Sequence, residues 1–251
     1  MTKHAIQLLR VVLALAVVAL ASTSVLFAQE TSSLDSPPPT KETPEGFVSL
    51  FDGKTLDGWK GAEKYWSVED GCITGRSTPE TPVPYSMYLV WQGKPVGDFT
   101  LLADFRIAEG GNSGIEYRAW KDDSREFGLN GYQADICPGD IMGILYGEGL
   151  GEIIATRGEL ATFDKAGNKT IKKFGDASEI AKSIRMTGWN TYRVEARGNR
   201  FTEYINDVKT AELVDEREKS PKEGIFGLQI HPGPPSFFQY KNIFLKGSRQ
   251  L

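Results

Sequence analysis

The segment FTLLADFRI, residues 99–107, decides the fold of this chain. Every second residue from Phe99 to Ile107 is apolar, and this alternation places Phe99, Leu101, Ala103, Phe105 and Ile107 on one face of an extended strand. A period of two is typical of a half-buried antiparallel strand. Because such a strand must pair with others, the segment predicts a sheet with one face against a core.

Further strands follow along the chain with turn residues between them. Residues 190–197 alternate in the same way, Gly198-Asn199 supplies a turn, and 200–205 runs back. Residues 224–230 and 237–246 predict a closing pair of strands. Many short strands separated by glycine-containing turns predict an all-β sandwich or barrel.

Helical signal is scarce in the same region. Residues 176–185 predict one short helix in an excursion between strands. This excursion does not change the all-β prediction.

The start of the chain predicts export. An unbroken apolar run of eleven residues, 11–21, follows Lys3 and Arg10. A membrane-spanning helix needs about 20 such residues, so a secretory signal over 1–28 fits better. Cleavage is expected after Ala21 or Ala28, and the mature protein is expected to be periplasmic or secreted, with no membrane attachment. The alternative is an uncleaved anchor.

A proline- and serine-rich stretch, 29–45, follows this signal. Its composition cannot bury a core, so it predicts a flexible tether without packed contacts. The remaining residues, 46–248, are enough for one sizeable β domain.

Charge and cysteine content limit the classes of partner and cofactor. A net charge of −4 and no lysine–arginine run argue against nucleic-acid binding. Cys72 and Cys137 predict either one disulfide or two buried thiols. The sequence contains no histidine pair and no cysteine cluster, so it does not predict a transition-metal site. The many carboxylates leave an oxygen-ligated divalent cation open as a structural or catalytic ion, so the metal is unknown.

Two strands carry polar side chains that suit ligand recognition. In 112–118, alternation places Glu116 and Arg118 on one face, where they form either a surface ion pair or part of a site. In 131–136, Gln133 and Asp135 share a face, which suits hydroxyl recognition or an ordinary solvated surface.

Two loops extend this polar set. The glycine-dense stretch 141–159 contains Tyr146, Glu148 and Arg157. His231 leaves a strand into Pro232 and is placed for acid–base chemistry, with Gln229 two residues earlier on the same face. A lone histidine is otherwise more often structural. We predict that the polar residues of both strands and both loops converge on one concave face.

An ordered set of segments resembles the 3-keto-disaccharide hydrolase domain family, formerly a domain of unknown function. The segments that carry this resemblance are 47–59 (FVSLFDGKTLDGW), 112–118, 131–136, 143–146, 155–158, 189–190, 227–235 and 241–243. No single segment is specific, but their order is, and the resemblance covers roughly 46–247.

The resemblance implies a concanavalin A-like jelly-roll sandwich of two antiparallel sheets. It also implies an enzyme that cleaves 3-keto-glycosides by elimination and hydration, as a 3-keto-glucoside 1,2-lyase or a 3-keto-2-hydroxy-glucal hydratase. That chemistry needs a base, an acid and donors for the enolate oxygen, with a small 3-keto-sugar as substrate and no required cofactor. The acid–base candidates are Asp135, His231, Glu116 and Glu148. The predicted substrate-binding residues are Arg118, Gln133, Tyr146, Arg157 and Gln229.

Two other functions compete with this enzyme. A non-catalytic carbohydrate-binding module has the same fold and would use exposed aromatic residues such as Trp91 and Trp120. A structural surface protein is the weaker alternative, because it leaves the polar clusters unexplained.

Overall fold

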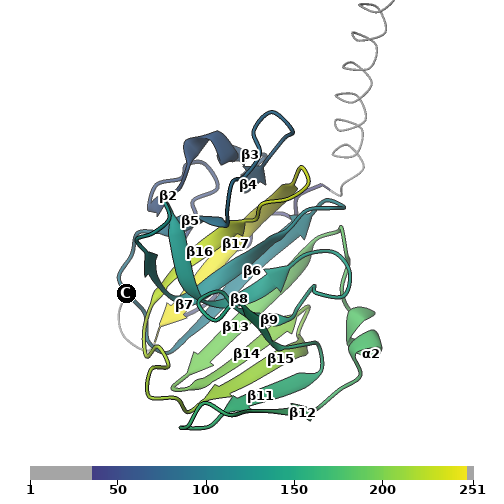
Figure 1. The fold of residues 1–251 in the computed structure, drawn as a ribbon. Helices are drawn as coiled ribbons and strands as arrows, with labels where there is room; N and C mark the ends of the chain where they lie inside the picture. Colours follow the sequence, from purple (N-terminus) through teal and green to yellow (C-terminus); the bar gives the residue numbers. More distant parts are fainter. Residues whose placement is uncertain (1–35, 248–251) are drawn as a thin grey trace, which may run out of the picture. The chain divides into compact units, whose positions relative to one another are not determined.

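The computed structural model describes residues 36–247, which form two stacked β-sheets (Figure 1). Residues 1–35 and 248–251 lie outside the described residues, and the predicted signal 1–28 is among them. Within 36–247, no helix is both long and apolar enough to span a membrane.

One sheet has ten strands. In spatial order they are β12 (Lys169–Lys173), β11 (Glu159–Phe163), β15 (Val208–Asp215), β14 (Arg200–Ile205), β13 (Asn190–Arg197), β6 (Phe99–Ile107), β17 (Phe237–Gly247), β4 (Cys72–Arg76) and β3 (Trp66–Glu69), with β1 (Val48–Ser49) also paired to β17.

The other sheet has seven strands. In spatial order they are β10 (Glu152–Ala155), β9 (Leu145–Gly147), β8 (Gly128–Ile136), β7 (Ser113–Asp122), β16 (Ile225–Ile230), β5 (Met87–Trp91) and β2 (Trp59–Lys60). Neighbouring strands in both sheets are antiparallel, except that β11 and β15 are parallel. The predicted antiparallel two-sheet sandwich is therefore confirmed.

The strand predictions match the structure closely. The stretches 99–107, 190–197 and 200–205 are β6, β13 and β14 without a shift at either end. The apolar face of β6 is buried, as the alternation predicts, and Phe99 packs edge-on against Phe226 of β16, with ring centroids 4.9 Å apart. The core therefore lies between the two sheets.

One carboxyl group lies inside this core. Glu203 of β14 is fully buried and accepts hydrogen bonds from Tyr117 Oη at 2.9 Å and Tyr192 Oη at 3.2 Å. Tyr117 belongs to the seven-stranded sheet and Tyr192 to the ten-stranded one, so the carboxyl group joins the two sheets.

The predicted helix is present but short. α2 spans Ala177–Ala181, and the Asp176 side chain caps it by accepting from Ser178 N at 2.8 Å and Glu179 N at 3.1 Å. Short-range turns replace the helix beyond Ala181.

The end of the predicted tether is docked on the ten-stranded sheet. Lys41 Nζ lies 2.8 Å from Asp104 Oδ1, and Lys41 N donates to Asn242 Oδ1 at 3.0 Å. Asn242 Nδ2 also donates to Pro39 O. The prediction that 29–45 makes no packed contacts is therefore wrong for 39–41. The nearly buried Asp104 carboxylate needs a cationic partner, and Lys41 supplies it.

Both cysteines are free thiols. Cys72 lies in β4 of the ten-stranded sheet, whereas Cys137 follows β8 of the seven-stranded sheet. Of the two alternatives left open, the structure therefore shows unpaired thiols.

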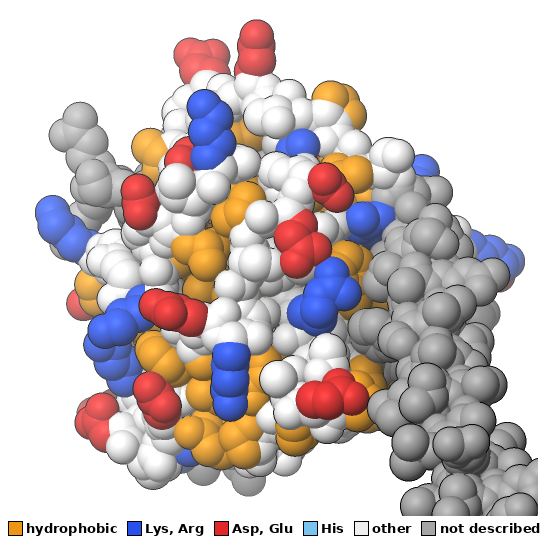
Figure 2. All heavy atoms as spheres, turned by 90° about the horizontal axis from the view of Figure 1, so that it is seen from above, with side chains coloured by type: hydrophobic (Ala, Val, Ile, Leu, Met, Phe, Trp, Pro, Cys, Tyr) orange, Lys and Arg blue, Asp and Glu red, His pale blue; other side chains and the backbone are white. Residues whose placement is uncertain are grey.

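The described surface carries charges of both signs. Figure 2 shows acidic and basic side chains interspersed on one face, with small apolar areas between them. The described residues of this face form no continuous basic stripe.

Candidate functional site

The outer face of the seven-stranded sheet carries a row of polar side chains. Asp135 of β8 pairs with Gly114 of β7, Gln133 pairs with Glu116, and Gln229 lies on β16 on the other side of β7. Gly114 has no side chain, and the Gln133 side chain lies over it: a Cβ at Gly114 would lie 2.6 Å from Gln133 Cδ. Asp135 lies on β8 and Gln229 on β16, and these strands are two interstrand spacings apart, which is about 10 Å.

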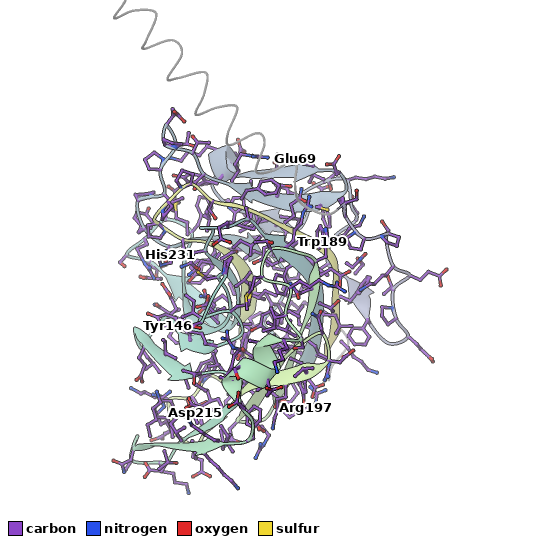
Figure 3. The ribbon with its side chains drawn as sticks, turned by 90° about the vertical axis from the view of Figure 1, so that its right-hand side faces the viewer. Glu69, Tyr146, Trp189, Arg197, Asp215 and His231 are labelled. Atoms are coloured by element: carbon purple, nitrogen blue, oxygen red, sulfur yellow. The ribbon has the colours of Figure 1, made fainter. Side chains whose placement is uncertain are left out.

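A cavity of about 280 Å³ opens over this row. We call it the Asp135 cavity, and its lining residues are Ser86, Asn112, Gln133, Asp135, Ile141, Ile144, Tyr146, Glu148, Ile153, Gln229 and His231. Six of the nine predicted site residues are among them. Figure 3 shows His231 and Tyr146 on the same side of the molecule.

Asp135 is the group that the cavity perturbs most clearly. Its side chain is almost fully buried, and its Oδ1 has no hydrogen-bond partner. Burial raises the pKa of Asp135 to about 7, although a hydrogen bond from the Gln133 amide acts against this rise. A carboxyl group with this pKa can both give and take a proton near neutral pH.

Further buried oxygens near Asp135 also lack partners. They are Gln133 Oε1, Gln229 Oε1 and both carboxylate oxygens of Glu116. Buried acceptors are normally satisfied by donors, and of these residues Gln133 and Gln229 line the cavity, so their amides suit a ligand with hydroxyl groups.

His231 is held in one tautomer. Its Nδ1 lies 2.6 Å from Pro232 O, and a carbonyl oxygen can only accept. The neutral ring therefore carries its proton on Nδ1 and keeps a lone pair on Nε2. Such a ring can act as a proton acceptor at the cavity.

Glu148 is fixed at the cavity wall by an arginine. Arg125 Nη1 lies 3.3 Å from Glu148 Oε1, and Glu148 N donates to Gly131 O at 3.1 Å. Burial raises the pKa of the neighbouring Tyr146, and the nearby carboxylates add to this rise. The Tyr146 hydroxyl therefore stays a donor at neutral pH.

Glu116 lies below the cavity and does not line it. The β7–β8 hairpin folds over this part of the sheet, and Phe127 O accepts from Tyr88 N at 3.0 Å. Leu129 of β8 packs closely over Gly227, the residue that pairs with Glu116. A Cβ atom added at Gly227 would lie only 2.4 Å from the Leu129 side chain. Glu116 is fully buried, and burial first, then Glu148 and Asp135, raise its pKa well above the ordinary range.

Arg118 does not share the face of Glu116, so that prediction is wrong. The β7–β8 register shifts between Tyr117 and Trp120, and Arg118 has a φ of 49°. This bulge turns the Arg118 side chain inward, where it donates to Pro221 O at 2.8 Å and contacts Asp98 Oδ1 at 3.2 Å.

We expect Arg118→Ala to lower the free energy of unfolding by about 1–3 kcal/mol, because the Pro221 carbonyl loses the donor that the buried Arg118 side chain supplies. Urea denaturation measures this change. Lys182→Ala, which removes an exposed ion pair with Glu179, is the control and should change stability by about 0.5 kcal/mol at most. Equal effects of the two substitutions would contradict the structural role of Arg118.

Arg157 also lies outside the cavity lining, contrary to its prediction as a substrate-binding residue. Its Nη1 donates to Gly139 O at 3.0 Å and Met142 O at 2.7 Å. Arg157 therefore supports the loop that carries Ile141 into the cavity.

The sequence did not single out Ser86 or Arg125. Ser86 precedes β5 without any motif, and Arg125 reaches Glu148 across 23 residues of sequence, so no local pattern indicates either. Of the two tryptophans proposed for a binding module, Trp91 packs against Phe226 at 5.7 Å, whereas Trp120 is half exposed.

No group of three or more histidine, cysteine, aspartate or glutamate residues within 36–247 is arranged to hold a metal ion.

Two solved structures have the same architecture. A proposed glycosyl hydrolase from Parabacteroides distasonis is 20% identical, with a TM-score of 0.52 over 82% of this chain and 95% of that chain. A Bacillus subtilis protein of unknown function with a galectin-like fold is 12% identical, with a TM-score of 0.51 over 83% and 97%. At these identities the comparison shows the fold alone.

Sequence comparison identifies the family. A 3-keto-disaccharide hydrolase from Bacteroides thetaiotaomicron is 34% identical over 116 residues, which cover 43% of this chain and 38% of that relative. The family model described as the 3-keto-alpha-glucoside-1,2-lyase-like domain matches residues 46–246, which include every residue of the Asp135 cavity. The chain therefore belongs to the 3-keto-alpha-glucoside-1,2-lyase-like domain family.

Proposed function

We propose that this protein is an exported enzyme that cleaves 3-keto-glycosides by elimination at sugar carbons 1 and 2, followed by hydration. The observation that carries the proposal is the meeting of Asp135 and His231 in one cavity of a chain of this family. The name of the Bacteroides relative points to the same substrate class. Export rests on the sequence of residues 1–28.

A ketone at carbon 3 makes the hydrogen on carbon 2 acidic. His231 Nε2, which has a free lone pair, takes this proton and leaves an enolate. The enolate collapses to restore the ketone, a double bond forms between carbons 1 and 2, and the bond from carbon 1 to the leaving oxygen breaks. Asp135, with its pKa of about 7, gives its proton to that oxygen.

Hydration reverses the two roles. The Asp135 carboxylate takes a proton from water as the water oxygen bonds to carbon 1, and the His231 imidazolium returns its proton to carbon 2. Neither Arg118 nor Arg157 lines the cavity, so the donors to the enolate oxygen in this proposal are neutral groups, of which Tyr146 and Asn112 are the candidates.

The test is product analysis with a 3-keto-glucoside and the matching ordinary glucoside. We expect only the 3-keto form to be cleaved at an appreciable rate, because only its carbon-2 hydrogen is acidic. Deuterium at carbon 2 should slow the reaction or exchange with solvent.

Equal rates for the two glucosides, without an isotope signal, would replace elimination by direct two-carboxylate hydrolysis. Binding of 3-keto-sugars without turnover would favour a carbohydrate-binding module.

A further inference from the structure

The lining of the Asp135 cavity changes in character across the seven-stranded sheet. The strands beneath it run in the order β10, β9, β8, β7, β16 and β5. The residues from the β7, β16 and β5 side are all polar: Asn112 precedes β7, Gln229 lies on β16, His231 follows β16, and Ser86 precedes β5. This side of the cavity suits the hydroxyl groups of a sugar.

The other side of the cavity is mainly apolar. Ile153 of β10 pairs with Tyr146 of β9, and Tyr146 pairs with Gln133 of β8. Paired residues on neighbouring strands present their side chains to the same face, so Ile153 and the Tyr146 ring are neighbours on the cavity face. Ile141 and Ile144, from the loop before β9, complete this side. We call Ile141, Ile144, Tyr146 and Ile153 the apolar wall.

The apolar wall extends from the buried part of the cavity to the solvent. Ile144 is buried, whereas Ile153 is 42% exposed although it lines the cavity, because β10 is the edge strand of the sheet. Glu148 is the charged lining residue on this side, and its carboxylate is paired with Arg125 at 3.3 Å. Covering apolar surface that water reaches is favourable. The wall therefore suits an apolar group that is attached to the bound sugar.

The proposed reaction determines the direction of the leaving group. The base, His231, follows β16, and the acid, Asp135, lies on β8, which is two interstrand spacings or about 10 Å nearer to β10. Carbon 2 faces the base, and the leaving oxygen on carbon 1 faces the acid. The line from carbon 2 to the leaving oxygen therefore runs from β16 towards β8. Continued beyond Asp135, it passes over β9 and β10, where the apolar wall lies.

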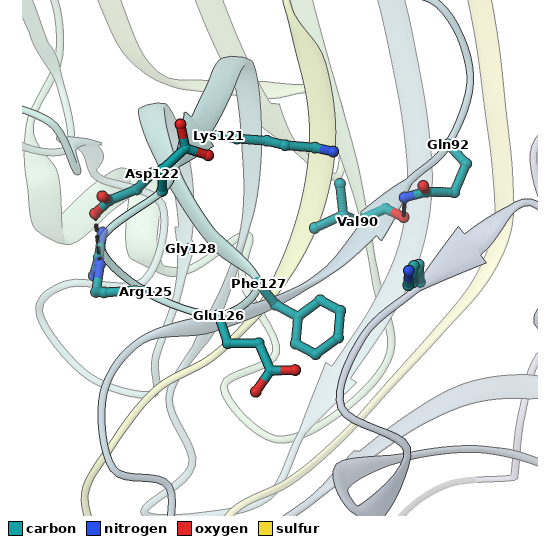
Figure 4. Close-up of a pocket in the computed structure, with 10 residues that line it drawn as sticks. Val90, Gln92, Lys121, Asp122, Arg125, Glu126, Phe127 and Gly128 are labelled. Atoms are coloured by element: carbon teal, nitrogen blue, oxygen red, sulfur yellow. Dashed lines mark hydrogen bonds and ion pairs between the residues drawn. The ribbon is translucent and has the colours of Figure 1, made fainter.

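A larger hollow nearby does not receive the leaving group. It encloses about 470 Å³ beside the β7–β8 hairpin, where Lys121 extends towards Val90 (Figure 4). Among the described residues, its lining and that of the Asp135 cavity have none in common. Fully buried Tyr88 of β5 separates them, and Tyr88 N donates to Phe127 O of the hairpin at 3.0 Å. The apolar wall is therefore the surface that adjoins the bound sugar.

We propose that the apolar wall binds the leaving group and that this group is an apolar ring rather than a second sugar. The inference rests on the proposed function, because the direction of the leaving group follows from the roles of His231 and Asp135. Ile141 and Ile153 pack against the ring. A sugar in the same place would press its hydroxyl groups against side chains that neither donate nor accept hydrogen bonds.

The test compares two 3-keto-glucosides whose leaving groups differ mainly in polarity. One carries cyclohexylmethanol, and the other carries glucose joined through its carbon-6 hydroxyl. Both leave as primary alcohols with a six-membered ring one carbon away, so both need the same acid. We expect the parent protein to cleave the cyclohexylmethyl substrate with a kcat/KM about tenfold higher, because the wall buries apolar surface equivalent to about two methylene groups.

Ile153→Asn should reduce this preference to about twofold or less, with kcat/KM for the glucose-bearing substrate within about twofold of the parent. Ile153→Thr, which keeps the β-branched shape of a strand residue, should reduce the preference in the same direction. Ile171→Asn is the matched control, because Ile171 is 45% exposed in β12, the edge strand of the other sheet. It should keep the tenfold preference. A parent without the preference, or an Ile153→Asn variant that retains it, would overturn the inference.

Failure of the proposed function is a separate outcome, in which the parent cleaves neither 3-keto-glucoside. Isothermal titration with the ordinary glucosides of the same two alcohols then decides the inference. The parent should bind the cyclohexylmethyl glucoside at least about fivefold more tightly than the disaccharide, and Ile153→Asn should bind the two about equally. Equal binding of both by the parent, or binding of neither, would also overturn the inference.

Discussion

Replacing Asp135 by asparagine is expected to lower kcat on a 3-keto-glucoside with a sugar leaving group by at least about a hundredfold. A sugar hydroxyl is a poor leaving group and needs a proton as the bond to carbon 1 breaks. The raised pKa of Asp135, about 7, keeps that proton available near neutral pH. Asparagine has the same shape but carries no acidic proton.

The choice of leaving group separates the roles of Asp135 and His231. A 3-keto-glucoside of 4-nitrophenol needs no acid, so Asp135→Asn should cleave it at nearly the parental rate. His231→Ala should be slow on both substrates, because removal of the carbon-2 proton precedes departure. Equal losses of Asp135→Asn on both substrates would contradict the assignment of Asp135 as the acid.

Stability is the control for these variants. Asp135→Asn removes a buried ionisable group, so its thermal midpoint at pH 7 should equal or exceed that of the parent. A lower midpoint would mean that the loss of activity reflects damage to the fold.

Strand alternation was sufficient to predict most of the sandwich. β6 and β13 each keep a strict period of two, and one face of each packs in the core. The same alternation placed Gln133 and Asp135 on one face correctly, because β8 has no irregularity between them.

Predictions from the sequence were wrong in two situations. One is a strand with an irregularity, and the other is a residue whose contact partner is distant in sequence. The bulge after Tyr117 changes the face on which Arg118 lies, and a positive φ at an arginine has no sequence signature. Lys41 looked like part of a tether because its partner, Asp104, is 63 residues away. Such contacts depend on tertiary pairing, which local composition does not encode.

The stability of the protein is expected to fall as the pH rises from 5 to 8. Burial raises the pKa of Asp135 from 3.8 to about 7, so over this range the folded state holds a proton that the unfolded chain has lost. The contribution of this proton to the free energy of unfolding is fully present below pH 4 and is lost as the pH rises through 7. The loss is about 3 kcal/mol between pH 5 and pH 8.

Two other buried carboxyl groups also make the stability fall as the pH rises. Burial raises the pKa of Glu116 and of Glu203 well above the ordinary range, although the hydroxyl groups of Tyr117 and Tyr192 partly oppose the rise at Glu203. Carboxyl groups with lowered pKa values, such as Asp122 at about 2, titrate below this window and do not offset the fall.

Urea denaturation at pH 5, 6, 7 and 8 measures this dependence. The parent should lose stability steadily, and Asp135→Asn and Glu116→Gln should each show a smaller slope, because an amide cannot ionise. Glu223→Gln, at an exposed position, is the matched control and should keep the parental slope. A parental slope in Asp135→Asn would mean that Asp135 ionises in the folded protein as it does in the unfolded chain, and the acid role argued from its raised pKa would then lose its physical basis.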